Sequence, residues 1–225
     1  MFLGGYQKVS LIDYPGVVAS VVFLRGCNFM CPYCHNPELL SAEGGIVLEE
    51  EFFSMLFANR RMLDGVCVTG GEPCLQLELP EFLSKLKDMG FKVKLDTNGS
   101  EPDMLGFILD KGLADYVAMD IKSSWENYSR IARPDSSADK VKKSLAVLQN
   151  SRTDHEFRTT IFPGVHTMDD FLSIAGYLKD GSKYFVQNIK REKTLEEIFA
   201  ETDLFAENVA EELGNRFPKL LIDHR

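Results

Sequence analysis

Three cysteines within eight residues are the part of this sequence best suited to metal or redox chemistry. Cys27, Cys31 and Cys34 have the spacing Cys-x3-Cys-x2-Cys and follow an apolar run. Thiolates are soft ligands that suit both iron–sulfur clusters and zinc. Three of them could hold three irons of a cuboidal cluster and leave the fourth iron open, whereas an electron-transfer cluster normally takes a fourth cysteine. An open position is typical of a catalytic metal site.

A structural zinc site is the alternative interpretation of these thiols. Its fourth ligand would be His35, but the consecutive positions of Cys34 and His35 make a closed tetrahedral site awkward. Of the two remaining cysteines, we expect Cys67 to belong to the core. We expect Cys74 to be a small packed residue after a glycine turn.

Further polar motifs end the apolar runs that come later in the chain. Gly70, Gly71 and Glu72 end the second run, where the glycines would let the backbone approach a ligand and the acid could receive an ammonium group. By itself such a motif could be a simple turn. Its interpretation therefore depends on where the sheet places it relative to the cysteines.

Charged side chains also stand in runs that otherwise indicate buried strands. Asp96 and Asn98 belong to an Asp-Thr-Asn-Gly motif, which alone could be an Asx turn. Asp120 and Lys122 end the fourth run, and Arg158 lies in the fifth. Charges in buried strands are costly unless they are paired or bound to something. These side chains are therefore candidate binding residues.

Six short runs predict strands, and most of them are rich in Val, Phe and Ile, as strands buried on both faces should be. We expect them at Val17–Leu24, Val66–Thr69, Lys92–Asp96, Tyr116–Ile121, Glu156–Phe162 and Tyr184–Asn188.

Helices are predicted between these strands. Capping boxes are expected at Ser136, Thr167 and Thr194, and the last helix, over about residues 195–213, is acidic and would present a solvated face. His155 and His166 have no partner motif, so we expect ordinary surface histidines.

Six strands alternating with helices predict an α/β fold with a parallel sheet. Six units are too few for a closed eightfold barrel, so we expect a partial, open (β/α)6 TIM-like barrel. We expect residues 1–225 to form a single domain with a core over about 17–190 and a helical extension over about 194–225. Ligands of such sheets bind at the carboxyl ends of the strands, where the motifs lie.

Composition limits the classes of partner. The net charge of −9 argues against a non-specific binder of nucleic acid or of an anionic membrane. The start of the chain does not resemble a signal peptide, and the longest apolar run is too short to span a bilayer. We therefore expect a cytoplasmic protein without nucleic-acid or membrane partners, in which five cysteines indicate metal or redox chemistry rather than disulfides.

The cysteine loop, with Tyr33 before its last cysteine, resembles the signature of the radical S-adenosylmethionine superfamily. In that superfamily the open iron binds the amino and carboxylate groups of the cofactor's methionine. The resemblance implies a 4Fe–4S cluster on Cys27, Cys31 and Cys34, with S-adenosylmethionine beside it. It also implies reductive cleavage of this cofactor to a 5′-deoxyadenosyl radical, which needs no general base.

The strand-end motifs resemble the cofactor contacts of the same superfamily. The Gly-Gly-Glu run is similar to its motif that receives the methionine amino group, and the later motifs resemble those of glycyl-radical-enzyme activases. The residues so implied to contact the cofactor are Tyr33, Gly70, Gly71, Glu72, Asp96, Asn98, Asp120, Lys122 and Arg158. Some activases hold a monovalent cation, for which Asp96, Thr97 and Asp120 could supply oxygen ligands.

The run from Ser10 to Gly16 resembles the Ser-x-x-Asp-x-Pro-Gly run of these activases. With the segment Cys34–Leu39 it is most similar to activating proteins of anaerobic ribonucleoside-triphosphate reductase, and next to pyruvate formate-lyase activases. The latter have a histidine near the end of the sixth strand, where this chain has Gln187 and Asn188. The resemblance implies a glycyl radical enzyme as partner and a flavodoxin or ferredoxin as electron donor.

Two other functions stay open at this point. The first keeps the radical chemistry but acts on a small molecule, as in enzymes similar to 7-carboxy-7-deazaguanine synthase. The second is a non-catalytic zinc or electron-transfer module.

Overall fold

The computed structural model describes residues 1–43, 47–133, 138–189, 194–196 and 205–225. Its strands form one eight-stranded sheet in the order β1 to β8. They are β1 Leu3–Ser10, β2 Ala19–Leu24, β3 Gly65–Gly70, β4 Lys92–Thr97, β5 Tyr116–Asp120, β6 Asp154–Thr160, β7 Lys183–Gln187 and β8 Leu221–His224. All neighbours pair in parallel except β1, which is antiparallel to β2.

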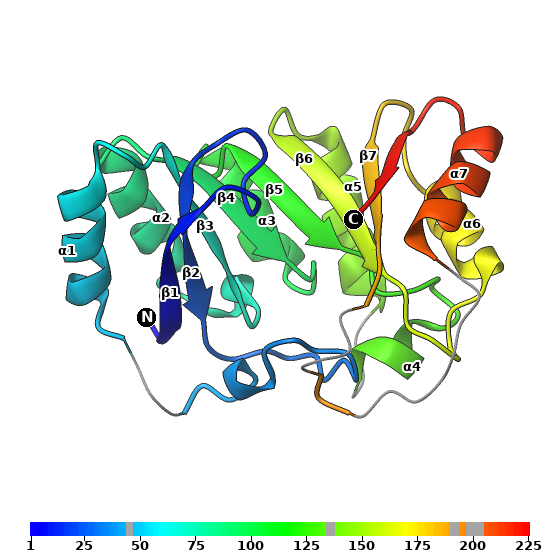
Figure 1. Ribbon diagram of the computed structural model, residues 1–225, viewed down its shortest axis with the longest axis horizontal. Coiled ribbons are helices and arrows are strands. Elements are labelled where there is room, and N and C mark those ends of the chain that lie inside the picture. Colours follow the sequence, from blue (N-terminus) through cyan, green and yellow to red (C-terminus); the bar gives the residue numbers. More distant parts are fainter. Residues whose placement is uncertain (44–46, 134–137, 190–193, 197–204) are drawn as a thin grey trace.

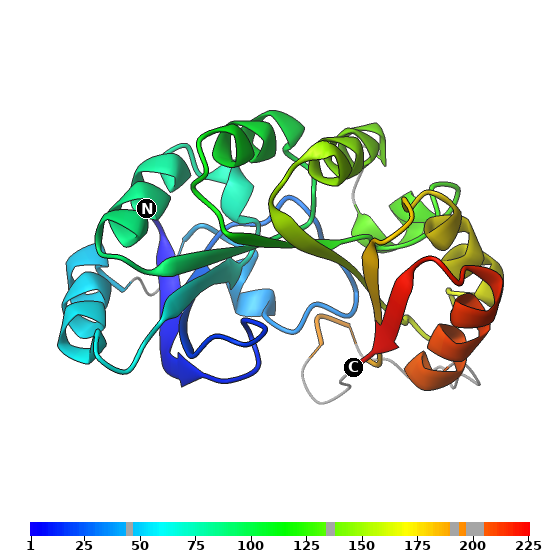
Figure 2. The ribbon, with the colours of Figure 1, turned by 90° about the horizontal axis from the view of Figure 1, so that it is seen from above.

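Helices follow most strands and lie on the outer side of the curved sheet. They are α1 Glu49–Asn59, α2 Leu79–Asp88, α3 Pro102–Asp110, α4 Tyr128–Ala132, α5 Ala138–Asn150, α6 Met168–Gly176 and α7 Ala206–Arg216, with 3-10 turns at Pro37–Leu39 and Pro73–Leu75. Figure 2 shows the sheet as an open arc with β1 and β8 at its two ends. This confirms the predicted α/β class and the open barrel. Within the described residues, no helix combines the length and apolar character that crossing a membrane requires.

The core lies between the sheet and the outer helices. The strands β2 to β5 are almost completely buried. Helices cover their outer face, and their other face looks into the interior of the arc. The helix α2 contributes Leu79, Phe82, Leu83 and Leu86, which recur at helical spacing and are all buried.

All six predicted strands are present, with ends that differ by at most two residues from the prediction, but the two edge strands β1 and β8 were not predicted. The first is buried only at its two ends and half-buried or exposed between them, and the second has only four residues, mostly exposed. The expected helical extension therefore ends in a strand of the sheet. The helix α1 was also missed, because its apolar residues Phe52, Phe53, Met55, Leu56 and Phe57 do not keep to one face.

Of the predicted capping boxes, the one formed by Thr167 and Asp170 is confirmed at the start of α6. The boxes at Ser136 and at Thr194, the latter through Glu197, depend on residues outside the described ranges, as does part of the predicted helix over 195–213. Of its described residues, 195 and 196 are not helical, whereas those from Ala206 onward belong to α7, where Glu207 and Glu211 are exposed, as a solvated face requires.

Candidate functional site

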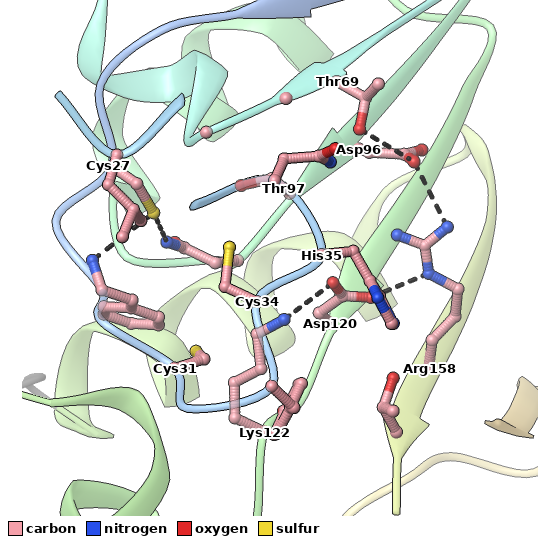
Figure 3. A pocket seen from close by; sticks show the side chains of 18 of the residues that line it. Cys27, Cys31, Cys34, His35, Thr69, Asp96, Thr97, Asp120, Lys122 and Arg158 are labelled. Atoms are coloured by element: carbon pink, nitrogen blue, oxygen red, sulfur yellow. Dashed lines mark hydrogen bonds and ion pairs between the residues drawn. The ribbon is translucent and has the colours of Figure 1, made fainter. Parts of the chain in front are cut away.

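A pocket of about 270 Å³ opens at the carboxyl ends of the strands. It is lined by side chains from the loop after β2 and from the ends of β3 to β7 (Figure 3). The predicted site residues that line it are Cys27, Cys31, Tyr33, Cys34, Gly70, Gly71, Asp96, Thr97, Asn98, Asp120, Lys122 and Arg158. Only Glu72 among the predicted residues does not line it. One pocket thus collects motifs that lie far apart in the sequence.

The cysteine loop is held by backbone hydrogen bonds at both ends. Gly26 N donates to Leu39 O at 2.7 Å and Cys27 N donates to Leu40 O at 3.1 Å, so the chain returns beside its own start. Cys34 N donates to Cys31 O at 2.9 Å, and this hydrogen bond closes a turn that brings the last two cysteines close together. The short spacing between the three thiols therefore follows from a compact loop.

The thiols lie in a largely apolar environment that also contains N–H donors. Cys27 Sγ accepts from Phe29 N at 3.4 Å and from Asn98 Nδ2 at 3.9 Å (Figure 3). Burial raises the pKa of Cys27 to about 12 and that of Cys31 to about 11. Without metal these two thiols keep their protons at neutral pH, so metal binding must release them.

The donor set fits an iron–sulfur cluster better than a single metal ion. Within the described ranges, no three Cys, His, Asp or Glu side chains form a group that could hold one metal ion. A cuboidal cluster binds each thiolate through a different iron, so its ligands stand farther apart. The buried hydroxyl of Tyr33 has no hydrogen-bond partner among the described residues, which leaves a polar group for a ligand of the pocket.

The two glycines of the Gly-Gly-Glu run are required by close backbone packing. A Cβ on Gly70 would lie 2.4 Å from Leu24 N and Leu24 O, and one on Gly71 would lie 2.1 Å from Gly26 O. Gly70 also has a φ of 120°, a conformation that favours glycine. The end of β3 therefore packs directly against the backbone that leads into the cysteine loop, besides lining the pocket.

Glu72 is placed differently from the expectation that its side chain receives an ammonium group. The side chain is fully buried, and its carboxylate accepts from Asn98 N at 2.6 Å, Thr97 Oγ1 at 2.8 Å and Cys74 N at 3.0 Å. Burial raises the pKa of Glu72, against the effect of these donors. The carboxylate thus joins the end of β3 to the end of β4, and only the backbone of this run borders the pocket.

Five charged side chains form a continuous set of ion pairs along the pocket. Asp96 pairs with Lys94 and with Arg158, whose Nη1 lies 3.2 Å from Asp96 Oδ2. Arg158 Nε donates to Asp120 Oδ1 at 2.8 Å, and Lys122 Nζ donates to Asp120 Oδ2 at 2.9 Å. Figure 3 shows Asp96 of β4, Asp120 of β5 and Arg158 of β6 converging with Lys122, which follows β5.

These ion pairs keep both acids charged. Although burial opposes it, the charges of Arg158 and Lys94 hold the pKa of Asp96 below its ordinary value. Arg158 and Lys122 do the same for the pKa of Asp120. A ligand with both an ammonium and a carboxylate group, such as the methionine end of S-adenosylmethionine, would find partners of both signs here.

The predicted oxygen ligands of a monovalent cation are already engaged. Asp96 and Asp120 each pair with two cations, and Thr97 Oγ1 donates to Glu72 while it accepts from Gly99 N at 3.0 Å. The described residues therefore do not present the open set of oxygens that a hard cation prefers.

Sequence reasoning missed two polar residues that hold this site together, Lys94 and Asn28. Lys94 precedes Asp96 by two positions, so strand periodicity could have placed both on one face. Asn28 accepts from Asn98 Nδ2 at 3.1 Å and donates to Ser100, and no sequence signal indicated this link between the cysteine loop and β4.

His166 was wrongly expected at the surface. It is buried, its Nδ1 accepts from Phe162 N at 2.9 Å, and its Nε2 lies 2.9 Å from Lys122 O. His155 is half-buried, and its Nδ1 contacts Thr153 O. Cys67 and Cys74 are buried, as expected.

Comparison with known proteins agrees with this geometry. The family model described as the radical SAM superfamily matches residues 21–178. A protein of Methanocaldococcus jannaschii with the provisional name of a glycyl-radical enzyme activating enzyme is 34% identical over 230 residues, covering 99% of this chain and 93% of that protein. A pyruvate formate-lyase-activating enzyme of Clostridium pasteurianum is 36% identical over 122 residues, covering 52% of this chain and 50% of the enzyme.

A solved structure supports the fold. Streptococcus suis SuiB bound to S-adenosylmethionine matches with a TM-score of 0.66 at 13% identity, over 91% of this chain and 51% of SuiB. The chain thus spans about half the length of that protein.

Proposed function

The chain belongs to the radical SAM superfamily, whose chemistry uses a 4Fe–4S cluster and S-adenosylmethionine, and we propose that it activates a glycyl radical enzyme. The observation that carries this proposal is the similarity to an activating enzyme of nearly the same length, over almost the whole of both chains. A module shared by unrelated radical enzymes would instead match over the barrel alone.

In this proposal Cys27, Cys31 and Cys34 hold three irons of the cluster. When bound and reduced, the cluster and S-adenosylmethionine supply a 5′-deoxyadenosyl radical that removes a hydrogen atom. The residues of the chain bind and orient the cofactor: Lys122 and Arg158 offer positive charge to its carboxylate, and Asp96 and Asp120 offer negative charge to its ammonium group. Tyr33 and Asn98 complete the wall beside the cysteine loop.

The shape of the sheet supports a polypeptide as the substrate. The strands form an open arc rather than a closed barrel, with β1 and β8 apart at its ends (Figure 2). A glycine on an extended loop of a partner could approach the pocket from this side, as extended peptides do at other sheet edges. We propose that this loop carries the glycine whose hydrogen is removed.

Anaerobic ribonucleotide reductase is the partner that the sequence favours, through the run from Ser10 to Gly16. In the structure Ser10 Oγ accepts from Ile12 N and Asp13 N, both at 3.2 Å, so the run forms a defined turn between β1 and β2. We further propose a flavodoxin or ferredoxin as the electron donor and the cytoplasm as the location.

The test is formation of a glycyl radical. Anaerobically reconstituted and reduced protein would be mixed with S-adenosylmethionine and the anaerobic ribonucleotide reductase of the same organism. We expect the doublet signal of a glycyl radical by electron paramagnetic resonance, and no signal with a reductase whose radical glycine is replaced by alanine. Cofactor cleavage without a radical on this reductase, on pyruvate formate-lyase or on other co-expressed candidates would refute the activase proposal and favour a small-molecule substrate.

A further inference from the structure

Lys94 is a buried cation placed directly behind the pocket. It lies in β4, two residues before Asp96, and its side chain is 2% exposed. Its Nζ donates to a carboxylate oxygen of Asp96 and to Cys67 Sγ, the latter at 3.8 Å. Lysine is almost never fully buried unless it is paired, so the ion pair with Asp96 accounts for its place in the core.

The carboxylate of Asp96 is therefore fixed from two directions. Lys94 approaches Oδ1 from within the strand, whereas Arg158 Nη1 and Thr69 Oγ1 approach Oδ2 at 3.2 Å and 3.4 Å. Asp120 is enclosed in the same manner by Arg158 and Lys122. Three cations thus face two carboxylates in this set of ion pairs, before any ion enters the pocket.

A mobile monovalent cation would meet two obstacles here. The oxygens that would bind it already accept charged hydrogen bonds, and Thr97 directs its hydroxyl hydrogen to Glu72. The ion would also stand near three fixed positive charges, whose repulsion is strong in a partly buried site. The ion would neutralise and orient Asp96. The ammonium group of Lys94 already does both.

We propose that Lys94 replaces the monovalent cation, so that this chain binds S-adenosylmethionine without a requirement for potassium or sodium. The proposal concerns the cofactor end of the site and is independent of which partner enzyme receives the radical. Lys94 acts in it as a positioning residue, because it contacts Asp96 and does not line the pocket.

The experiment measures ion dependence rather than turnover. Reconstituted holoenzyme would be examined at one ionic strength in potassium, sodium or tetramethylammonium chloride, the last ion being too large to enter. The measurements are the dissociation constant of S-adenosylmethionine, by anaerobic equilibrium dialysis, and the melting temperature. For the unmodified chain we expect a dissociation constant that changes less than about twofold among the three salts. We expect the melting temperature to be the same in all three.

A variant removes the fixed charge. Lys94→Met keeps the length and apolar stem of the side chain but frees one face of Asp96. We expect its affinity for S-adenosylmethionine to fall in tetramethylammonium and to recover at least about fivefold in potassium or sodium. Lys87→Met is the matched control, because Lys87 pairs with Asp115 at 2.6 Å on the outside of the molecule. It should show no ion-specific response.

Two results would overturn the proposal. One is tighter cofactor binding, or a higher melting temperature, of the unmodified chain specifically in potassium or sodium. This measurement needs no variant, so it decides the question even where Lys94→Met does not fold. The other is a folded Lys94→Met whose cofactor affinity is that of the unmodified chain in all three salts, which would give Lys94 a purely structural role. Neither measurement uses a partner enzyme. Both therefore test the role of Lys94 even if the activase proposal fails.

Discussion

At the scale of single residues, the cysteine loop is the feature on which the proposed chemistry depends. Cys31 is buried beside Tyr33, and its replacement removes one of only three thiols that line the pocket. We expect Cys31→Ala to lose most of the iron bound after anaerobic reconstitution, because two thiolates cannot hold a site-specific cluster. The measurement is iron and sulfide content per chain. Cys67→Ala is the control, since Cys67 is equally buried but lies away from the loop.

Retention of the full iron content by Cys31→Ala would contradict the assignment of this ligand. Loss of iron from Cys67→Ala as well would indicate that the apoprotein, rather than the cluster site, had been damaged.

Glu72 allows a test that needs no cofactor. Its carboxylate accepts three hydrogen bonds that connect β3 with β4, although its motif resembles a cofactor contact. We expect Glu72→Gln to lower the free energy of unfolding of the apoprotein by about 1–3 kcal/mol, because an amide nitrogen would face buried donors. Urea unfolding of the apoprotein measures this. An unchanged stability would mean that the side chain serves the cofactor alone.

Residue types were predicted better than residue surroundings. The spacing of the cysteines and the positions of Asp96, Asp120 and Arg158 at strand ends were sufficient to place them in one pocket. The role of Glu72 was not predictable, because two of its three donors, Thr97 and Asn98, lie 25 and 26 positions later, at the end of the neighbouring strand β4. The spacing of two residues between Lys94 and Asp96 indicated that both side chains lie on one face of the strand. Lysines are rarely buried, however, so this spacing alone favoured an exposed Lys94.

At the scale of elements, the loop before α6 ties two segments that border the site. His166 links Phe162, after β6, to Lys122, after β5. Asp170 at the start of α6 accepts from Thr167 N and Asn127 Nδ2 at 2.9 Å and 2.8 Å. The segment that carries Lys122 is therefore fixed by α6.

The buried histidine makes this link sensitive to pH. Burial lowers the pKa of His166 from 6.5 to about 4, so the unfolded chain takes up its proton at a higher pH than the folded chain. His166 therefore makes its full contribution to the free energy of unfolding above pH 6.5, and this contribution is lost as the pH falls toward 4. Between about pH 7.5 and about pH 5.5 we expect a loss of about 1 kcal/mol in the free energy of unfolding.

The control is His166→Gln, whose amide reaches the same acceptor but does not titrate. Urea unfolding of both proteins should show a weaker pH dependence for the variant over this interval. The hydrogen bonds of Asp170 hold its pKa at about 2 despite burial, so this carboxylate does not change its charge in the interval. An identical pH dependence of the two proteins would show that His166 titrates normally.

Elements were predictable where they are buried. The inner strands β2, β3 and β5 have nearly continuous apolar runs and are almost completely buried. The edge strands β1 and β8 lack this signature, since each has only one neighbour and stays partly exposed. Pairing with the existing sheet, which a local pattern does not reveal, makes these segments strands.

At the scale of the whole molecule, the last residue ties β8 to the inner face of the sheet. Arg225 Nη1 and Nη2 donate to the two carboxylate oxygens of the buried Glu156 on β6, at 2.9 Å and 3.0 Å. Tyr116 on β5 donates to the same carboxylate at 2.8 Å, and the Arg225 guanidinium lies 3.7 Å from the ring centre of Phe185. One end of the open arc is thus fixed to its middle.

Removal of this arginine should cost stability. Arg225→Met leaves the charge of Glu156 buried without its cation, and we expect the free energy of unfolding to fall by about 2 kcal/mol, less than for a fully buried pair because Arg225 is partly exposed. Urea unfolding measures the change. Adding Glu156→Gln should restore part of the loss, because no charge then stays buried alone.

The control is Arg216→Met, which breaks an exposed pair with Glu212 and should lower the free energy of unfolding by less than about 1 kcal/mol. Equal losses from both arginine variants would contradict this account.

The open arc, the pocket at its carboxyl ends and the full-length similarity to an activating enzyme lead to one central claim, that the hydrogen removed comes from a glycine of a partner protein. The most direct measurement is the fate of that hydrogen. The partner reductase would be produced with α-deuterated glycine, activated by this protein, and the 5′-deoxyadenosine analysed by mass spectrometry. We predict that it carries one deuterium; unlabelled 5′-deoxyadenosine formed alongside an active partner would contradict the claim.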